Sequence, residues 1–193
     1  MIVRERFRLS PMTREFHPSR LDVDAFAETA ATVSGEEPLA SYPRLQAELA
    51  APAPGSTVHW KATGACRGGS AGGTVPWLHL SAGARVPLIC QRCLGPVDVD
   101  LQIDRWFRFA GDEAIAAAED EASEEDVLVS SRDFDLRALV EDELLMEIPI
   151  TPRHEVCPEL IRFSAEDPDF NGEEGARPNP FAVLGTLRPR KPE

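Results

Sequence analysis

The fold of this chain is organised around residues 88–101, which read LICQRCLGPVDVDL. Cys90 and Cys93 are separated by two residues, with an apolar run before the pair and an alternating run after it. Two thiols at this spacing on a tight turn can bind one metal ion or close one reactive disulfide. The pair alone leaves both chemistries open, because structural zinc normally takes four ligands.

Further metal ligands can come from the segment after residue 150. Cys157 is the only later cysteine, and His154 stands three residues before it. Cys90, Cys93, His154 and Cys157 would form a Cys3His set of the kind that holds structural zinc, provided that the fold brings them together. We therefore predict zinc at these four residues. The alternatives are that the cysteines are free and packed, or that only the pair Cys90 and Cys93 matters.

The residues after the cysteine pair give the clearest strand signal. Apolar side chains at 97, 99, 101 and 103 alternate with polar ones at 98, 100, 102 and 104, which is typical of a half-buried strand running to about residue 109. Strand-like runs also occur at 57–62, 74–80, 84–90 and briefly at 127–129, with turns expected at 64–73 and from Gly83. Short strands joined by Gly and Pro predict an antiparallel meander.

Two segments predict amphipathic helices. Residues 21–33 follow the capping residue Asp22, and Gly35 and Pro38 would end that helix. A second helix starts after Asp133 or Asp135 and stops at Pro149; its apolar stripe is Leu136, Leu139, Val140 and Leu144. For the acidic segment 111–126 we expect a loop. The predicted fold class is α+β: an antiparallel sheet, either a meander or closed like a barrel, with two main amphipathic helices and long polar loops.

The chain has 193 residues, a length that suits one domain with tails. We expect an extended N-terminal arm at 1–20, one α+β domain at 21–165 that carries the cysteine pair, and a flexible segment at 166–193 that contains PNPFAVL. Four cysteines do not make a disulfide scaffold in a chain of this size. Without a visible signal peptide or a run of about 18 apolar residues, we expect a cytoplasmic protein with no membrane contact.

The formal net charge of −13 restricts the choice of partner. Phosphate binding needs a basic field, so this charge argues against a general nucleic-acid coat protein. A partner that is itself basic, such as a ribosomal protein, suits it better.

Three stretches together resemble a known family. They are CQRCL at 90–94, DLRALVEDELLMEIPITPRH at 135–154 with Cys157 just after it, and RPNPFAVL at 177–184. Their order and spacing are similar to those of the bacterial YceD family, the large ribosomal RNA subunit accumulation proteins. The resemblance spans nearly the whole chain, although residues 1–55 carry no specific motif. The chain departs from the pattern in its Gly-rich turn with Cys66, and at Met146, where an aliphatic residue is more usual.

The resemblance implies a role in synthesis, processing or stability of the 23S ribosomal RNA of the large subunit, and it supplies no established catalytic residues. We therefore expect a non-enzymatic ribosome-biogenesis factor that binds a pre-ribosomal large subunit or a basic ribosomal protein, with direct contact to ribosomal RNA left open. The expected partner-binding residues are Glu141, Asp142, Glu143, Pro178, Asn179, Pro180 and Phe181.

Other functions remain as alternatives at this point. One is a zinc-clipped binding module for a ribosomal protein, and another is a thiol–disulfide oxidoreductase at Cys90 and Cys93. Redox CxxC motifs usually lie at a helix N-terminus, whose dipole lowers the thiol pKa, whereas residues 94–96 lead into an alternating strand. Glu143 and Glu147 could serve as paired carboxylates, but their spacing is also that of a solvated helix face.

Overall fold

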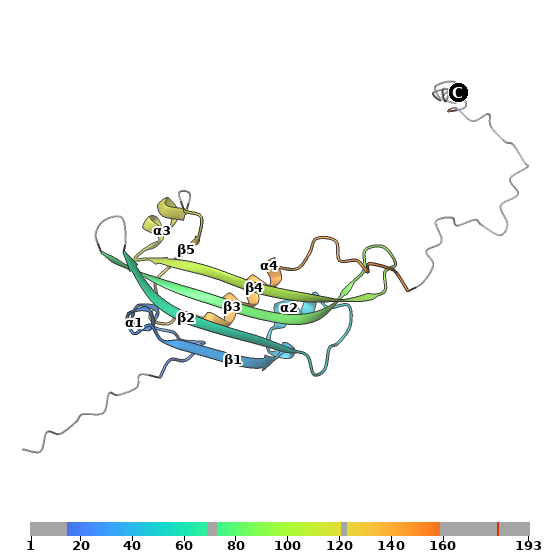
Figure 1. Cartoon of the computed structure of the whole chain (residues 1–193), viewed down its shortest axis with the longest axis horizontal. Helices are drawn as coiled ribbons and strands as arrows, with labels where there is room; N and C mark the ends of the chain where they lie inside the picture. Colours follow the sequence, from blue (N-terminus) through green and yellow to red (C-terminus); the bar gives the residue numbers. More distant parts are fainter. Residues whose placement is uncertain (1–14, 69–72, 121–122, 159–180, 182–193) are drawn as a thin grey trace, which may run out of the picture. The chain divides into compact units, whose positions relative to one another are not determined.

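A five-stranded sheet forms the centre of the computed structural model, which describes residues 15–68, 73–120, 123–158 and 181 (Figure 1). The strands lie side by side in sequence order: β1 (Thr32–Pro38), β2 (Thr57–Gly68), β3 (Thr74–Ile89), β4 (Pro96–Ala110) and β5 (Asp126–Val129). β1 to β4 pair antiparallel, whereas β5 runs parallel to β4. The predicted α+β class is confirmed. The expected all-antiparallel sheet is wrong for β5, and the sheet is open, so it is not barrel-like.

The parallel direction of β5 follows from the segment that joins it to β4. Parallel neighbours need a crossover connection, usually a helix, and α3 (Glu113–Asp120) lies in this connection. Asp112 caps the helix, because its Oδ1 accepts a hydrogen bond from the Ile115 amide at 2.9 Å. Ala116 is buried with Val127 of β5. The loop predicted at 111–126 is therefore wrong: a run of alanines has high helix propensity, and β5 supplies a surface for it.

β3 is one long strand where the sequence predicts two strands separated by a turn at Gly83. Gly83 pairs with His59 of β2 and with Gln102 of β4. A Cβ at position 83 would lie 2.8 Å from both side chains. The glycine is therefore needed for close approach within the sheet, and it does not mark a turn.

The N-terminal helix is shorter than predicted. α1 (Val23–Glu28) starts at Asp22, whose carboxylate accepts from the Ala25 amide at 3.1 Å, as expected for a cap. The chain then turns at Ala30, whose φ is 46°, and continues as β1. Gly35 lies in that strand rather than ending a helix, and the Trp60 ring occupies the space where a Cβ would be, 2.6 Å away.

Except for α3, the helices cover one face of the sheet (Figure 1). α1 and α4 (Leu136–Met146) contact the strands, and α2 (Pro43–Ala47), which follows the short η1 turn (Leu39–Ser41), packs on α4. Asp135 caps α4, as one of the two predicted candidates. The predicted apolar stripe of this helix is buried in the core: Leu136, Leu139, Val140 and Leu144.

The opposite face of the sheet carries more polar side chains, because neighbouring residues of a strand point to opposite faces. His59 and Lys61 are exposed there, whereas Val58 and Trp60 lie in the core. The described residues up to Pro158 belong to one compact unit. The boundaries expected at residues 20 and 165 stay a prediction.

Candidate metal centre

The two cysteines of the CxxC pair lie in the tight turn between β3 and β4. The Leu94 amide donates to the Cys90 carbonyl at 2.9 Å, and the Cys90 amide donates to the Gly95 carbonyl at 2.9 Å. These two hydrogen bonds close the turn at residues 90–95, which we call the knuckle. Cys90 is fully buried and Cys93 is half-buried. The knuckle therefore presents both thiols toward the inside of the fold.

The other two donors come from the connector at residues 147–158, which follows α4. The Gln91 amide donates to the Pro152 carbonyl at 2.8 Å and so ties the connector to the knuckle. His154 and Cys157 follow this tie and are both half-buried. A hydrogen bond between backbone segments about 60 residues apart thus brings the second half of the ligand set to the first.

The four predicted ligands form one cluster. The donor atoms of Cys90, Cys93, His154 and Cys157 all lie within 4.8 Å of one another, and Cys93 Sγ is 3.5 Å from His154 Nδ1. Sulfur ligands of tetrahedral zinc stand roughly 3.8 Å apart when each bond is about 2.3 Å. Closure by about an ångström would therefore suffice for a bound ion. Three thiols and one imidazole are a donor set that suits zinc.

The thiols of the cluster differ in acidity. Burial opposes ionisation of Cys90, but hydrogen bonds from the backbone amides of Cys93, His154 and Arg92 outweigh burial and lower its pKa to about 5. Burial raises the pKa of Cys157, and the neighbouring thiols of Cys93 and Cys90 raise it further. The fold thus favours ionisation of Cys90 and opposes that of Cys157, from which a bound metal ion would displace a proton.

Comparison with known proteins identifies the family. The family model described as "Large ribosomal RNA subunit accumulation protein YceD" matches residues 78–188, more than half of the chain. This chain belongs to the YceD family. The resemblance inferred from the three motifs is thereby confirmed, and all four donors of the cluster lie within the matched range.

One relative is the Large ribosomal RNA subunit accumulation protein YceD of Haemophilus influenzae. It is 32% identical over 106 residues, which cover 53% of this chain and 60% of the relative. No solved structure matches the chain.

Two of the three acidic residues expected to bind a partner on this YceD chain are buried, and all three have partners inside the fold. Glu141 and Glu143 are buried, and they pair with Arg44 and Arg105, respectively. Asp142 is half-exposed and also pairs with Arg44. A role of these three carboxylates in partner binding stays a prediction, and Asp142 is the one that reaches solvent.

The C-terminal part of the predicted partner site lies almost entirely outside the described residues. Pro178, Asn179 and Pro180 are not described, and Phe181 is 69% exposed. Their role in binding likewise stays a prediction.

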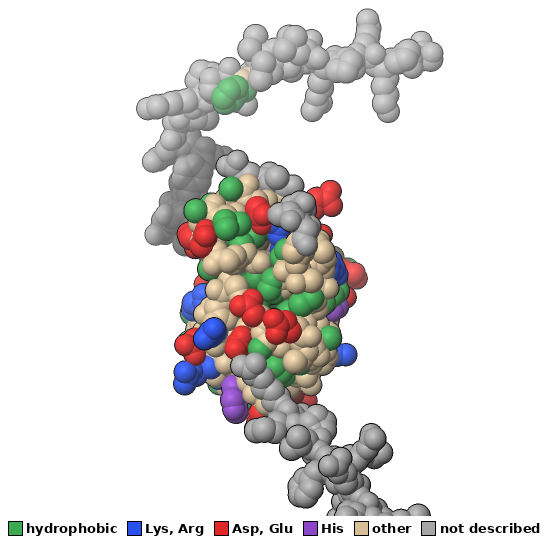
Figure 2. Space-filling model, turned by 90° about the vertical axis from the view of Figure 1, so that its left-hand side faces the viewer, with side chains coloured by type: hydrophobic (Ala, Val, Ile, Leu, Met, Phe, Trp, Pro, Cys, Tyr) green, Lys and Arg blue, Asp and Glu red, His purple; other side chains and the backbone are tan. Residues whose placement is uncertain are grey.

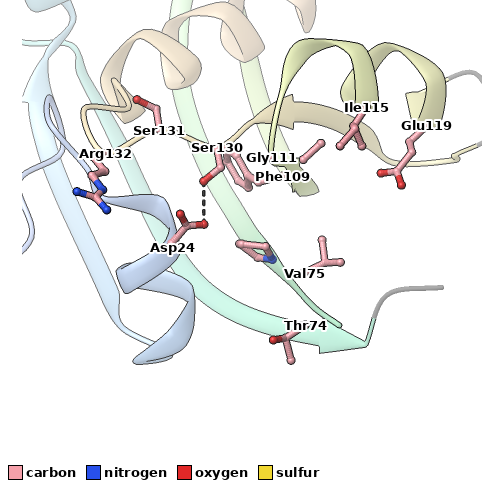
Figure 3. Close-up of a pocket in the computed structure, with 12 residues that line it drawn as sticks. Asp24, Thr74, Val75, Phe109, Gly111, Ile115, Glu119, Ser130, Ser131 and Arg132 are labelled. Atoms are coloured by element: carbon pink, nitrogen blue, oxygen red, sulfur yellow. Dashed lines mark hydrogen bonds between the residues drawn. The ribbon is translucent and has the colours of Figure 1, made fainter. Parts of the chain in front are cut away.

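A cavity at the other end of the sheet was not foreseen from the sequence. It has a volume of about 480 Å³ and lies between α1, the start of β3, α3 and the loop after β5 (Figure 3). The Ser130 hydroxyl donates to Asp24 at 2.8 Å within it, and Glu119 and Arg132 also line it. Acidic and apolar side chains are interspersed on this end of the molecule (Figure 2). No histidine, cysteine or lysine is among the described residues that line the cavity.

No helix in the described part of the chain combines the length and the apolar character needed to cross a membrane.

Proposed function

We propose that this chain is a non-enzymatic ribosome-biogenesis factor that supports the synthesis, processing or stability of the 23S ribosomal RNA of the large subunit. The observation that carries this proposal is membership of the YceD family over residues 78–188. The relative in Haemophilus influenzae is named for accumulation of the same RNA. The expected place of action is the cytoplasm, where large subunits are assembled.

We also propose that Cys90, Cys93, His154 and Cys157 hold one zinc ion. Four protein donors complete a tetrahedral shell and leave no open position, which is the arrangement of structural rather than catalytic sites. An ion there would fasten the connector to the knuckle. Its chemical contribution would be to stabilise the fold.

Thiol–disulfide exchange finds less support. A pKa of about 5 at Cys90 would suit a reactive thiolate, but this side chain is fully buried and attack on a disulfide requires access. The knuckle also leads into β4, so the cysteines do not lie at a helix N-terminus. Both features favour a ligand over a redox thiol.

The proposed partner is a pre-ribosomal large subunit or one of its basic proteins. A net charge of −13 disfavours binding to naked RNA and favours a cationic protein surface. Whether the chain touches ribosomal RNA within such a particle is a separate matter.

The test of the proposed function is depletion of the protein in its native host. We expect the ratio of 23S to 16S ribosomal RNA to fall and 23S precursors to accumulate, with recovery when the wild-type gene is restored. The purified wild-type protein should also sediment with precursor large subunits. An unchanged RNA ratio together with no association would overturn the proposal.

A further inference from the structure

Exposed apolar side chains gather around the candidate metal centre. Seven large apolar side chains are exposed among the described residues. Four of them stand within four residues of a cluster ligand in the sequence, and they are 46%, 75%, 96% and 84% exposed: Ile89, Leu94, Ile150 and Val156. We call these four residues the knuckle patch. Exposed apolar groups that concentrate at one place usually mark an interaction site.

Leu94 is an unfavourable choice for the fold itself. Its φ is 60°, in the left-handed region that is strained for a residue with a Cβ and that glycine adopts freely. Its side chain is also 75% exposed, so burial among the described residues does not offset that strain. A leucine at this turn therefore calls for a reason outside the fold of the isolated chain.

Two surface grooves adjoin the same residues. Ile89 and Ile150 line a groove of about 260 Å³, and Val97 and Val156 line another of about 730 Å³. Because each groove has members of the knuckle patch in its wall, this end of the molecule offers depressions as well as exposed apolar side chains. Such a surface suits the side chains of a protein segment.

The charge around the patch distinguishes between classes of partner. Glu48 lines the first groove, while Asp98 and Glu155 line the second; the one guanidinium among the lining residues is that of Arg153. Nearby, Arg92 lies on the knuckle and Arg85 pairs with Asp98 at 3.3 Å. The contact surface thus has no basic surplus that could hold phosphates, and the whole chain carries a charge of −13. A second copy of this chain would be repelled by the same charge.

We propose that the knuckle patch is the docking surface for an apolar segment of a basic protein of the large ribosomal subunit. The inference rests on the proposed function and adds to it where the partner binds and what the partner's chemistry is. Apolar side chains of the partner would cover Leu94 and enter the flanking grooves. The acidic field of the chain would favour a partner rich in lysine and arginine.

The first test is photo-cross-linking on the full chain. A benzophenone amino acid replaces Leu94 in one protein and Ile115 in a control, because Ile115 is 45% exposed on α3, away from the cluster. Each protein is bound to purified precursor large subunits and irradiated. We expect position 94 to cross-link to a lysine- and arginine-rich ribosomal protein and position 115 to give no such product. Cross-links from position 94 only to RNA or to a second copy of the chain, or none while the wild type binds, would overturn the inference.

The second test measures affinity for the same particles. Combined Leu94→Ser, Ile150→Ser and Val156→Ser substitutions should weaken association by about tenfold or more, whereas Ile115→Ser should leave it unchanged. The single variant Leu94→Gly is a control for misfolding, because glycine adopts the positive φ of position 94 without strain. This variant should bind more weakly than the wild type but lose no stability. If the wild type binds and all of these variants bind equally well, the docking surface is wrong and the proposed function stands. If the wild type does not bind, the docking surface is wrong, and the RNA ratio after depletion then decides the proposed function.

Discussion

Glu141 is a residue of α4 whose carboxylate caps a different helix. It accepts hydrogen bonds from the backbone amides of Arg44 at 2.7 Å and Leu45 at 3.2 Å, and from Arg44 Nε at 3.0 Å. These amides belong to the first turn of α2, whose own N-cap residue Tyr42 supplies no side-chain hydrogen bond. A negative charge at a helix N-terminus also interacts favourably with the helix dipole. The second family motif thus contains a carboxylate that joins two elements of the fold.

Replacing Glu141 tests this bridging role. We expect Glu141→Ala to lower the free energy of unfolding by about 2–4 kcal/mol, because the part-buried Arg44 amide and the buried Leu45 amide lose their acceptor. Asp142→Ala is the matched control: its pair with Arg44 is half-exposed, so the loss should stay below about 1 kcal/mol. Urea denaturation measures both. An equal or larger effect at Asp142 would contradict the interpretation.

At Glu143, burial of the carboxyl outweighs the interactions that favour its charged form. Burial raises the pKa of this carboxyl, the Arg105 guanidinium at 3.1 Å lowers it in part, and Asp126 raises it again, so the net shift is upward. The folded state therefore binds a proton more tightly than the unfolded chain. Stability should be higher at acid pH and should fall as the pH rises through the raised pKa.

The Glu143→Gln substitution tests whether burial or the pair with Arg105 dominates at this position. The amide copies the protonated carboxyl, so the variant should be more stable than the wild type at pH 7. The difference should shrink to nothing as the pH falls below the ordinary glutamate pKa, because both proteins are then neutral at this position. Urea unfolding at a series of pH values from about 4 to 7 measures it, with Glu147→Gln as a control for removing an exposed charge from the end of the same helix. A destabilised Glu143→Gln protein at pH 7 would mean that the Arg105 pair outweighs burial.

At the scale of elements, the connector is held to the sheet by few backbone contacts. Among the described residues, the hydrogen bond from the Gln91 amide to the Pro152 carbonyl is the one backbone tie between the connector and the knuckle. A zinc ion on the four-residue cluster would add four bonds between the same two segments. We therefore expect the packing of the connector against the knuckle to depend on the bound metal.

Metal removal and one cysteine substitution test that dependence. The wild type, purified without a tag, should contain one zinc ion per chain, and Cys157→Ser should lose it with a Tm lower by roughly 5–10 °C. Cys66→Ser is the matched control, because Cys66 is an exposed thiol on β2 outside the cluster. A chelator should lower the Tm of the wild type and leave that of Cys157→Ser unchanged. If the wild type contains no zinc and the chelator leaves its Tm unchanged, the zinc proposal is wrong.

At the scale of the whole molecule, charge governs the choice of partner. With a net charge of −13, long-range attraction favours basic proteins, and repulsion opposes naked RNA. Salt screens such forces, since the Debye length falls from about 10 Å at 0.1 M to about 3 Å at 1 M.

Salt titration tests the role of net charge. Binding to basic proteins extracted free of RNA from large subunits should weaken as salt rises from about 50 to 500 mM, mainly through a slower association rate. Binding to isolated 23S ribosomal RNA should stay weak even at the lowest salt. Tight binding to that naked RNA, or a salt-independent affinity for the proteins, would contradict the prediction.

The sequence by itself determined the features that depend on neighbouring residues. Alternation at 97–103 predicted which face of β4 is buried, because successive strand residues point to opposite sides. The apolar stripe of residues 136–144 predicted α4, since a helix repeats every 3.6 residues, and left Asp133 and Asp135 as candidate caps. The spacing of Cys90 and Cys93 predicted their turn. The three motifs predicted the family, which the family match confirmed.

Only the tertiary structure decided what depends on distant contacts. The Trp60 ring against Gly35 favours a strand at 32–38, where the local pattern predicted only the end of a helix, and close packing at Gly83 keeps β3 continuous. The crossover through α3 makes β5 parallel. Cys93 and His154 are 61 residues apart in the sequence and come into contact only in the fold. Contacts with α2 and β4 bury Glu141 and Glu143 of α4. A local sequence pattern predicts which side of a helix or strand is apolar, but it does not predict which other element packs against that side.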